Sequence, residues 1–486
     1  MAFLIGGANS AADTGFDVDN SCRFNDGDSA KMSKTLGTAT NNKKFTVNAW
    51  LKLGAGTIGA NKVHATARDG TSGPYLNINL QGSDNDHQLS IYGNDKDSAN
   101  EFDYRTTRKF TDQAAWYMIT VAMDTTLGAA GDRLRIYVNG VEETDFAQET
   151  HPTQNAIYVM NYTGYTFVVG ARTDDSEYWD GYMAEFCMID GSQLGPTSFG
   201  EFDADSPRIW KPIDVSGLTF GNNGFYLDFK DSSNLGNDAN GGTDLTEANL
   251  AAADQATDTC TNNFCTMNPL DNEYVDATFS EGNNQIVIAS GIKTYATGTM
   301  GVSTGKWYWE VEMDAYSGSS DDYQAVGICD RVSTSNNTDS YAVGYPANFV
   351  YTSEGTFKES GTTNTIATVN SYAPNDIVGV ALDLDNNKLY FSKNGTFQDS
   401  GDPTSGATGT GAMDVIATSH ASSSGFYFPL IGSDTTARGA TWKCNFGGCS
   451  AFTVSSANQD ANGFGNFEYA VPSGYLALCT KNLGSD

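Results

Sequence analysis

Two stretches of the chain share one alternation of apolar and polar positions. Residues 116–142 read WYMITVAMDTTLGAAGDRLRIYVNGVE, and residues 378–397 read VGVALDLDNNKLYFSKNGTF. In both, β-branched and aromatic residues recur at every second position around an Asp/Asn/Gly turn, which predicts antiparallel strands with one buried face. Each copy closes on Asn-Gly, which tolerates positive φ and favours a tight hairpin turn. The pattern predicts an all-β chain with two jelly-roll-like β-sandwich domains built on the same hairpin.

Similar alternation divides the remaining chain into domains. Strand-like segments recur through the first half between turns rich in Gly, Asn and Asp, including 75–80, 88–92 and 101–106. We therefore expect a first sandwich over 1–212 and a second over 273–455. Residues 213–272, which are small, polar and acidic, are expected to form an extended connecting strap, and residues 456–486 a C-terminal tail.

Composition strengthens the all-β prediction and limits the partners. Among 486 residues there are 52 Gly, 24 Tyr and 26 Phe, and 59 acidic residues against 27 basic ones give a net charge of −32. A field of that sign repels nucleic acid and anionic membrane surfaces, so no nucleic-acid role is expected. Membrane insertion is not expected either, because no stretch of the sequence is long and apolar enough to span a bilayer. The start MAFLIGGANS has no basic region of a secretory signal, which predicts folding in a cytosol.

The eight cysteines are expected to be buried thiols rather than a disulfide framework. The alternative is a four-thiolate zinc site, because Cys260/Cys265 and Cys444/Cys449 are both C-x4-C pairs. That spacing is unusual for structural zinc.

Several short sequence segments, taken in their order along the chain, resemble known protein families. FTVNAWLKLG, WYMITVAMD, LRIYVNGVE, VVGAR and WDGYMAEFCMIDG follow one another in a way that resembles a laminin-G-like domain of the concanavalin A-like lectin/glucanase superfamily. SFGEFDADSPRIWKP, GFYLDFKDSSNLGNDANG and NNFCTMNPL are similar to phrases of tailed-bacteriophage virion proteins. From Glu273 onward, GKWYWEVEMD, QAVGICD, FYFPLIGSD and WKCNFGG resemble a SPRY domain, a β-sandwich that usually binds proteins.

These resemblances imply a structural protein of a bacteriophage virion, assembled in the host cytoplasm. We expect a tail-fibre or appendage component that contacts other virion proteins, binds host-surface polysaccharide or another receptor, and forms a homo-oligomer, most simply a trimer. The alternative is a capsid or tail decoration or adaptor protein that binds only other virion proteins.

The sequence does not argue for an enzyme, and no catalytic residue is predicted. A glycan-cleaving depolymerase would need two carboxyl groups about 5 to 5.5 Å apart across a cleft. Glu310, Glu312 and Asp314 alternate on one strand face, but in the SPRY-like half, where non-enzymes carry the same pattern.

Sugar binding needs exposed aromatic faces beside hydrogen-bonding side chains. The candidate patch comes from loop-like segments of the first domain and comprises Tyr162, Tyr165, Asp174, Asp175, Tyr178, Trp179 and Asp180. A comparable cluster in the second domain comprises Tyr341, Tyr345, Phe349 and Tyr351. Two alternatives stay open for both clusters: an adaptable protein-binding surface, or rings that pack in the sandwich cores.

Calcium is the cofactor that the acidic loops suggest, because hard cations need several converging oxygen ligands. The candidate ligands crowd one loop and are Asp228, Asp231, Asn234, Asn237 and Asp238. Laminin-G-like proteins sometimes hold calcium at the sandwich edge, so the resemblance points the same way. The alternative is that these Asp and Asn residues mark turns by bonding their own backbone.

Overall fold

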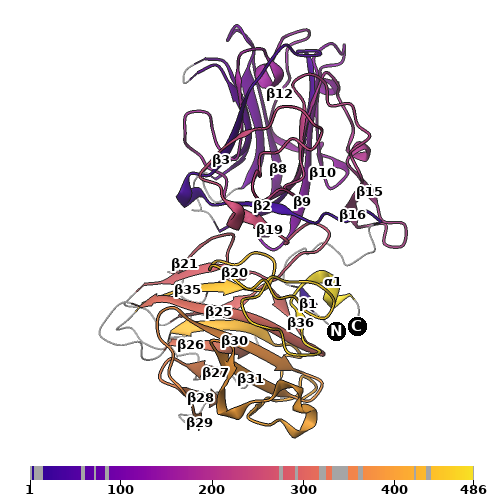
Figure 1. The fold of residues 1–486 in the computed structure, drawn as a ribbon. Coiled ribbons are helices and arrows are strands. Elements are labelled where there is room, and N and C mark those ends of the chain that lie inside the picture. The colour runs from indigo at the N-terminus through magenta and orange to yellow at the C-terminus, as the bar shows by residue number, and fades with distance from the viewer. Residues whose placement is uncertain are drawn as a thin grey trace. The chain divides into compact units, whose positions relative to one another are not determined.

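The computed structural model describes residues 3–4, 15–55, 61–70, 73–82, 87–272, 277–289, 294–316, 324–330, 348–359, 365–420, 423–433 and 439–484. Its regular structure is almost entirely β-strand, which confirms the predicted all-β fold (Figure 1). Contacts divide the chain into an N-terminal unit, Ala12–Thr261, and a C-terminal unit, Asn262–Asp486 together with Met1–Ala11. No helix in the described ranges is long and apolar enough to cross a membrane.

The N-terminal unit contains two antiparallel sheets. The first, called the hairpin sheet, has the order β11-β10-β9-β4-β14-β2-β19, with β17 added to β14. Its strands are β2 (Ser21–Phe24), β4 (Lys44–Leu53), β9 (Trp116–Asp124), β10 (Leu134–Val138), β11 (Val141–Glu142), β14 (Gly181–Asp190), β17 (Phe225–Leu227) and β19 (Gln255–Ala256).

The second sheet, called the ladder sheet, has the order β12-β8-β7-β6-β5-β13-β3-β18. Its strands are β3 (Lys31–Thr35), β5 (Lys62–Arg68), β6 (Tyr75–Gln81), β7 (Gln88–Asn94), β8 (Glu101–Lys109), β12 (Phe146–Thr150), β13 (Thr166–Val169) and β18 (Thr246–Ala248). One continuous core of buried side chains unites the two sheets, including Val121 and Ile136 of the hairpin sheet and Leu76 and Ile91 of the ladder sheet. The unit is therefore a β-sandwich.

Both repeated phrases form the predicted hairpins. Strands β9 and β10 pair antiparallel, and so do β30 (Asp376–Asp383) and β31 (Lys388–Lys393). The Asn-Gly turns join β10 to β11 and β31 to β32 (Thr396–Phe397), and these pairs are antiparallel hairpins as well. The dipeptide Asn139-Gly140 follows β10 with φ of 47° and 78°, and Asn394-Gly395 follows β31 with φ of 49° and 76°. Positive φ at both positions is the geometry that favours Asn-Gly. The prediction of a hairpin closed by an Asn-Gly turn is confirmed in both units.

In the structure, residues 213–272 do not form the separate connecting strap that the sequence predicts. Short strands β17, β18 and β19 lie within 213–261 and pair with β14, β3 and β2, so this segment belongs to the N-terminal sandwich. The strands β18 and β19 have three and two residues, too few to show an alternating pattern in the sequence. The boundary between the units therefore falls at Thr261/Asn262.

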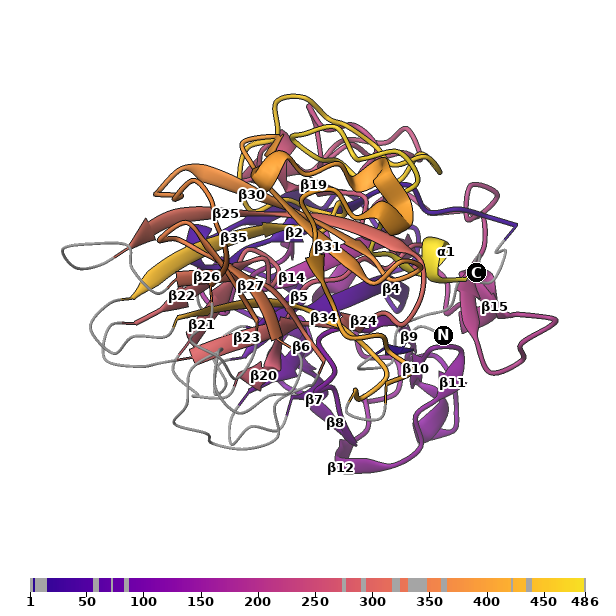
Figure 2. The ribbon, with the colours of Figure 1, turned by 90° about the horizontal axis from the view of Figure 1, so that it is seen from below.

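The C-terminal unit also contains two sheets, which are antiparallel except where β36 pairs in parallel with β25. One has the order β20-β23-β34-β26-β27-β28-β29, with β20 (Met267–Asn272), β23 (Thr294–Gly298), β26 (Gln324–Cys329), β27 (Asn348–Thr352), β28 (Thr356–Glu359), β29 (Thr365–Thr368) and β34 (Phe428–Ser433). The other has the order β21-β22-β35-β25-β30-β31-β32, with β33 on β31 and β36 on β25. Its strands are β21 (Ala277–Ser280), β22 (Gln285–Ile288), β25 (Lys306–Tyr316), β30 (Asp376–Asp383), β31 (Lys388–Lys393), β32 (Thr396–Phe397), β33 (Met413–Asp414), β35 (Ala440–Asn445) and β36 (Leu476–Ala477). Figure 2 shows β25, β30 and β31 side by side.

The segment expected as a C-terminal tail is packed onto the C-terminal unit. Phe467 and Tyr475 lie in a buried cluster with Tyr308 of β25. The buried carboxyl of Glu310 accepts hydrogen bonds from the backbone N–H groups of Glu468, at 2.9 Å, and Tyr469, at 2.8 Å. The segment is therefore part of this sandwich and completes its packing.

Small elements complete the description. Strand β1 (Phe3–Leu4) pairs with β24 (Met300–Gly301), and β15 (Gly200–Phe202) pairs with β16 (Trp210–Pro212). The helix α1 is Thr480–Leu483, and 3-10 turns occur at Asp26–Asp28, Ala130–Asp132, Val159–Asn161, Pro196–Ser198, Ala252–Asp254, Gln398–Ser400 and Pro403–Thr408. All eight cysteines are buried free thiols, as predicted.

Candidate functional site

The outer face of the ladder sheet, which is the face turned away from the core, carries rows of polar side chains. Along β6, Leu76 and Ile78 point into the core, so the alternate residues Asn77 and Asn79 point outward. Strand pairing aligns Asn77 with side chains of four other strands in one row, namely Thr66, Tyr92, Asp103 and Thr150. A parallel row contains Asn79, Ser90, Arg105 and Gln148.

Several polar atoms of this face are buried without a partner. Asn79 and Ser90 are only 1% and 3% exposed. Within the described residues, no hydrogen bond is made by Asn79 Oδ1, Gln81 Oε1 or Arg105 Nε. Buried polar atoms are normally satisfied by protein or by ordered water. Because these atoms are buried, a ligand on this face would have to contact the polar groups that line an open hollow.

A hollow of about 330 Å³ lies at the β6, β7, β8 and β12 end of this face. Its lining is Tyr75, Tyr92, Gly93, Glu101, Phe102, Asp103, Gln148 and Thr150. The Tyr75 and Tyr92 rings meet edge to face with centroids 5.9 Å apart, and the Arg68 guanidinium lies 5.7 Å from the Tyr75 centroid. The arrangement places two aromatic rings beside carboxyl, amide and hydroxyl groups.

Burial raises the pKa values of two side chains that line this hollow. It raises the pKa of the Tyr92 phenol, which therefore remains a hydrogen-bond donor near neutral pH. Burial also raises the pKa of Asp103, an effect that the nearby Arg105 guanidinium partly offsets. The hollow thus combines a phenol donor with a partly desolvated carboxyl acceptor.

The loop between β13 and β14 borders the same face through ion pairs. Arg172 contacts Asp174 at 2.7 Å and Glu177 at 2.8 Å, and Arg68 contacts Asp174 at 3.4 Å. The peptide N–H of Val63 donates to the Glu177 carbonyl at 3.0 Å. Asp174 therefore positions Arg68 beside Tyr75 rather than offering a free carboxylate.

The sequence-predicted patch is not one exposed surface. Trp179 is fully buried in the core, and Tyr165 and Asp180 are also buried, so the prediction that these side chains are exposed for sugar contact is wrong. Tyr162 packs edge to face on Tyr165 with centroids 5.1 Å apart. Trp179 lies two residues before β14. Alternation in the sequence does not distinguish a loop from the residues that lead into a long buried strand.

The remaining predicted residues are spread around the same loop. Asp175 is exposed and forms an ion pair with Lys31, and Tyr178 is half-buried. In the second unit, Phe349 and Tyr351 are core residues, so the predicted exposed cluster is wrong for these two. Tyr341 and Tyr345 lie outside the described residues.

The side chains predicted as calcium ligands form hydrogen bonds within their own loop. The Asp228 carboxylate accepts the N–H of Lys230, and the Asp231 carboxylate accepts both the N–H and the hydroxyl of Ser233. The Asn234 amide donates to Asp244 at 2.9 Å, and the Asn237 N–H donates to the Asn234 carbonyl.

Asp238, the fifth predicted ligand, faces a lysine. Its Oδ1 accepts two backbone N–H groups, and its Oδ2 lies 3.9 Å from the Lys34 ammonium. Among the described residues, no group of three or more His, Cys, Asp or Glu side chains is arranged to hold a metal ion. The donor set around this loop therefore does not fit calcium, and the turn-forming alternative explains most of its side chains.

Tyr75 and Tyr92 were not predicted as site residues, although the sequence contained a signal for them. The segments YLNINLQ and QLSIYGN alternate apolar residues with uncharged polar ones, and that alternation was used only to predict strands. Large polar residues such as Tyr and Asn at successive outward positions were the signal for a binding face.

Comparisons with known protein families agree with the two sandwiches. Residues 24–192 match the model of the concanavalin A-like lectin/glucanases superfamily, and residues 306–441 match the SPRY domain model. The chain combines a concanavalin A-like domain with a SPRY domain. A comparison with curated proteins finds no match.

Solved structures resemble the two domains at low identity. The SPRY domain of human HERC1 is 16% identical, covering 38% of this chain and 99% of that one, with a TM-score of 0.27. Domain 4 of the arabinanase AbnA from Geobacillus stearothermophilus, in complex with arabinotriose, is 16% identical and covers 40% and 84%, with a TM-score of 0.28. Mouse laminin α1 domains LG4-5 are 8% identical over 97% and 98%, with a TM-score of 0.28. Similarities with such low identities and TM-scores do not indicate what the concanavalin A-like domain binds.

Proposed function

We propose that the concanavalin A-like domain binds a glycan on the outer face of its ladder sheet. The observation that carries the proposal is the hollow in which Tyr75 and Tyr92 lie beside polar side chains of both cross-strand rows, Asp103 and Thr150 in one and Gln148 in the other. A sugar hydroxyl both donates and accepts, so a chain of sugars can satisfy such a mixed set. The match to a lectin/glucanase superfamily supports the same ligand class.

The hollow at Tyr75 and Tyr92 is where the strongest contacts are expected. Aromatic rings pack against the apolar C–H faces of a sugar while neighbouring polar groups fix its orientation. Asp103 and Gln148 stand in adjacent rows of the same hollow. These residues form the proposed glycan contact.

Replacing Tyr92 or Asp103 by Ala is expected to weaken glycan binding by about tenfold or more, because each change removes a buried contact or a charged hydrogen bond worth about 1.5 kcal/mol. The measurement is isothermal titration of the full chain with bacterial surface polysaccharides. Tyr178→Ala is the matched control, since this half-buried tyrosine lies outside the hollow. Equal affinity of the Tyr92 and Asp103 variants and the wild-type protein would reject the outer face as the site.

The finer proposal concerns the place of the protein in a virus. We propose a structural component of a tailed-bacteriophage tail fibre or appendage, located in the virion, which binds host-surface glycan and associates with other virion proteins as a homo-oligomer, a trimer in the simplest case. The phrases SFGEFDADSPRIWKP and NNFCTMNPL, which resemble those of phage virion proteins, support this role. The proposal assigns the protein no catalytic activity.

A competition experiment tests that role. Purified protein is added to host cells before the phage, with and without a calcium chelator, and the adsorption rate is measured. Slower adsorption is expected, and its reversal by Tyr92→Ala would assign the effect to the outer face. Loss of inhibition on chelation would support a calcium requirement that the loop geometry does not suggest. Unchanged adsorption with folded protein at saturation would favour the decoration or adaptor alternative.

A further inference from the structure

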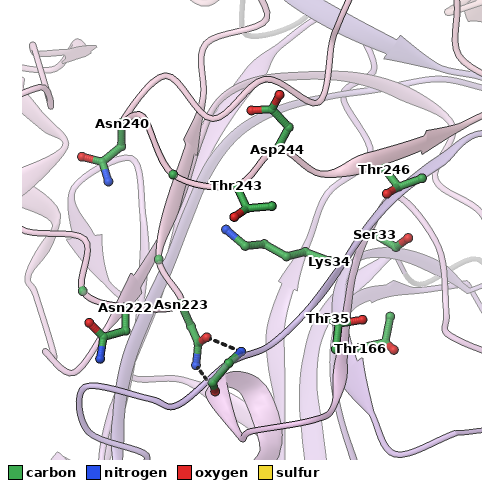
Figure 3. A pocket seen from close by; sticks show the side chains of 14 residues that line it. Ser33, Lys34, Thr35, Thr166, Asn222, Asn223, Asn240, Thr243, Asp244 and Thr246 are labelled. Atoms are coloured by element: carbon green, nitrogen blue, oxygen red, sulfur yellow. Dashed lines mark hydrogen bonds between the residues drawn. The ribbon is translucent and has the colours of Figure 1, made fainter.

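A second hollow, of about 550 Å³, lies at the edge of the ladder sheet and shares no lining residue with the hollow at Tyr92. It opens beside β3, where the pairing with β18 ends at Thr246 opposite Ser33. The turns 221–224 and 240–244 contribute most of the remaining lining (Figure 3). We call it the edge hollow.

The backbone of Thr35, the last residue of β3, faces this hollow. Successive residues of a strand direct their N–H and C=O groups to opposite sides. The N–H of Leu36 donates to the Tyr165 carbonyl at 2.8 Å, on the side of β13. The N–H and C=O of Thr35 therefore point to the other side, where β18 pairs with the earlier part of β3. Thr35 is exposed and lines the edge hollow.

This side of Thr35 is an unpaired strand edge. Continued pairing would place Asp244 opposite Thr35, but β18 begins only at Thr246, so that pair does not form. Within the described part of the chain, the N–H and C=O of Thr35 make no hydrogen bond on this side. An unpaired donor and acceptor on an exposed edge are open to a ligand that offers both kinds of group.

The next position along the same edge shows which group fits. The side-chain amide of Asn223 pairs with Gly37: its oxygen accepts the Gly37 N–H at 2.6 Å, and its nitrogen donates to the Gly37 carbonyl at 3.0 Å (Figure 3). Gly37 follows Thr35 by two residues, so its backbone groups face the same side. One carboxamide thus takes the place of a paired strand at Gly37, and Thr35 offers the same donor and acceptor to the hollow.

The pair of backbone groups discriminates among ligands. A primary carboxamide carries a carbonyl oxygen and an N–H on the same side, so it can satisfy both groups of Thr35. A carboxylate has no donor, and an ammonium or guanidinium has no acceptor, so each would leave one backbone group unsatisfied. A full β-strand does not fit, because β18 and Asn223 occupy the edge on either side of Thr35.

The charged side chains of the edge hollow also favour a neutral group. The lining contains one cation, Lys34, and one anion, Asp244. The Asp244 carboxylate already accepts the Asp238 N–H at 3.0 Å and the Asn234 amide at 2.9 Å. The lining therefore presents no excess of either charge to attract an ionic ligand.

We propose that the edge hollow binds a primary carboxamide, the side-chain group of Asn and Gln, through the backbone N–H and C=O of Thr35. The carboxamide belongs either to a polypeptide segment or to a free amino acid. A volume of about 550 Å³ is in the range of small-molecule sites. The site is separate from the outer face of the ladder sheet and does not depend on glycan binding there.

The test is a titration of the full chain, made with isotope-labelled threonine and followed by NMR. The probes are free L-glutamine, an acetyl-Gly-Gln-Gly peptide with an N-methylamide end, and the same peptide with Glu in place of Gln. Both Gln probes are expected to shift the Thr35 amide signal and to slow its hydrogen exchange. The Glu peptide, which lacks the amide donor, should do neither at neutral pH.

Two variants separate the backbone from the side chain of Thr35. Thr35→Pro removes the N–H and is expected to weaken binding of the Gln probes by about tenfold or more. Proline is tolerated on a strand edge where the N–H has no partner, so the stability of the unit should change little. Thr35→Val keeps both backbone groups and is the matched control. It should bind as the wild-type protein does, and its missing threonine signal assigns that of Thr35.

Each outcome bears on the proposal. Tighter binding of the Gln peptide than of free glutamine identifies a polypeptide as the source, and any other order identifies a free amino acid. Equal binding of the Gln and Glu peptides, wild-type affinity of Thr35→Pro, or an unchanged Thr35 signal with every probe overturns the proposal. Should Thr35→Pro fail to fold, the Thr35 signal of the wild-type protein still decides. Tyr92→Ala should leave this titration unchanged, which keeps the result independent of glycan binding on the outer face.

Discussion

Replacing Asp258 by Ala is expected to destabilise the N-terminal unit by about 3–5 kcal/mol, because it removes the carboxylate that a buried lysine contacts. Lys52 and Asp258 are each 1% exposed, and the Lys52 ammonium contacts the Asp258 carboxylate at 2.6 Å. The Trp116 indole N–H donates to the other carboxylate oxygen at 3.1 Å. The three side chains join β4, β9 and the 254–261 segment across the back of the hairpin sheet.

Urea unfolding followed by tryptophan fluorescence measures the loss. The matched control is Asp175→Ala, which breaks an ion pair with Lys31 in which the Asp175 side chain is 62% exposed. That pair should contribute at most about 1 kcal/mol. A similar small loss for both variants would show that the 254–261 segment contributes little to the sandwich. Its integration into the N-terminal unit would then need another explanation.

The second large effect is a pH dependence from Glu185. This residue is 4% exposed and sits in a β-bulge of β14 with φ of 50°. Its carboxyl accepts the Tyr226 hydroxyl at 2.6 Å. Burial raises the pKa of Glu185 to about 7 from an ordinary 4.5, although the Tyr226 hydrogen bond partly opposes this shift. The folded state therefore holds the Glu185 proton more tightly than the unfolded chain does.

The sign of the effect follows from that difference. The contribution of Glu185 to stability is fully present below pH 4.5 and is lost as the pH rises through about 7. A shift of this size corresponds to about 3 kcal/mol. Glu185→Gln, which carries no charge and can still accept the Tyr226 hydroxyl, should match the wild-type protein in acid. Above about pH 7 it should be more stable by up to that amount.

Urea unfolding across this pH range, with hydrogen exchange of the β14 and β17 amides as a local readout, checks the prediction. Glu201→Gln is the control, since this exposed side chain should leave the profile unchanged. Glu310 of the C-terminal unit also has a pKa raised to about 7 by burial, so its contribution should persist in Glu185→Gln. A variant with the wild-type pH profile would show that Glu185 ionises in the folded protein at its ordinary pKa.

The candidate sites show what kind of signal a sequence carries. Period-two alternation predicted β6, β7 and β8 and both hairpins, because the outward and inward positions of a strand are encoded locally. It did not predict Trp179 as a core residue, since an aromatic residue beside Tyr and Asp reads equally well as an exposed loop or as the start of a buried strand. It also left β18 and β19 unrecognised, because two or three residues show no period.

The sequence by itself determined the all-β class, the two sandwich domains and their repeated hairpins, since these depend on patterns within a few residues of one another. Only the tertiary structure decided which polar positions share a surface. Tyr92 and Gln148 line one hollow because β12 pairs with β8. The structure likewise decided buried pairs such as Lys34 and Asp238, which are far apart in the sequence and lie 3.9 Å from each other. Strand order depends on long-range pairing of edges and on burial against the opposite sheet, and alternation within a single strand contains no record of either.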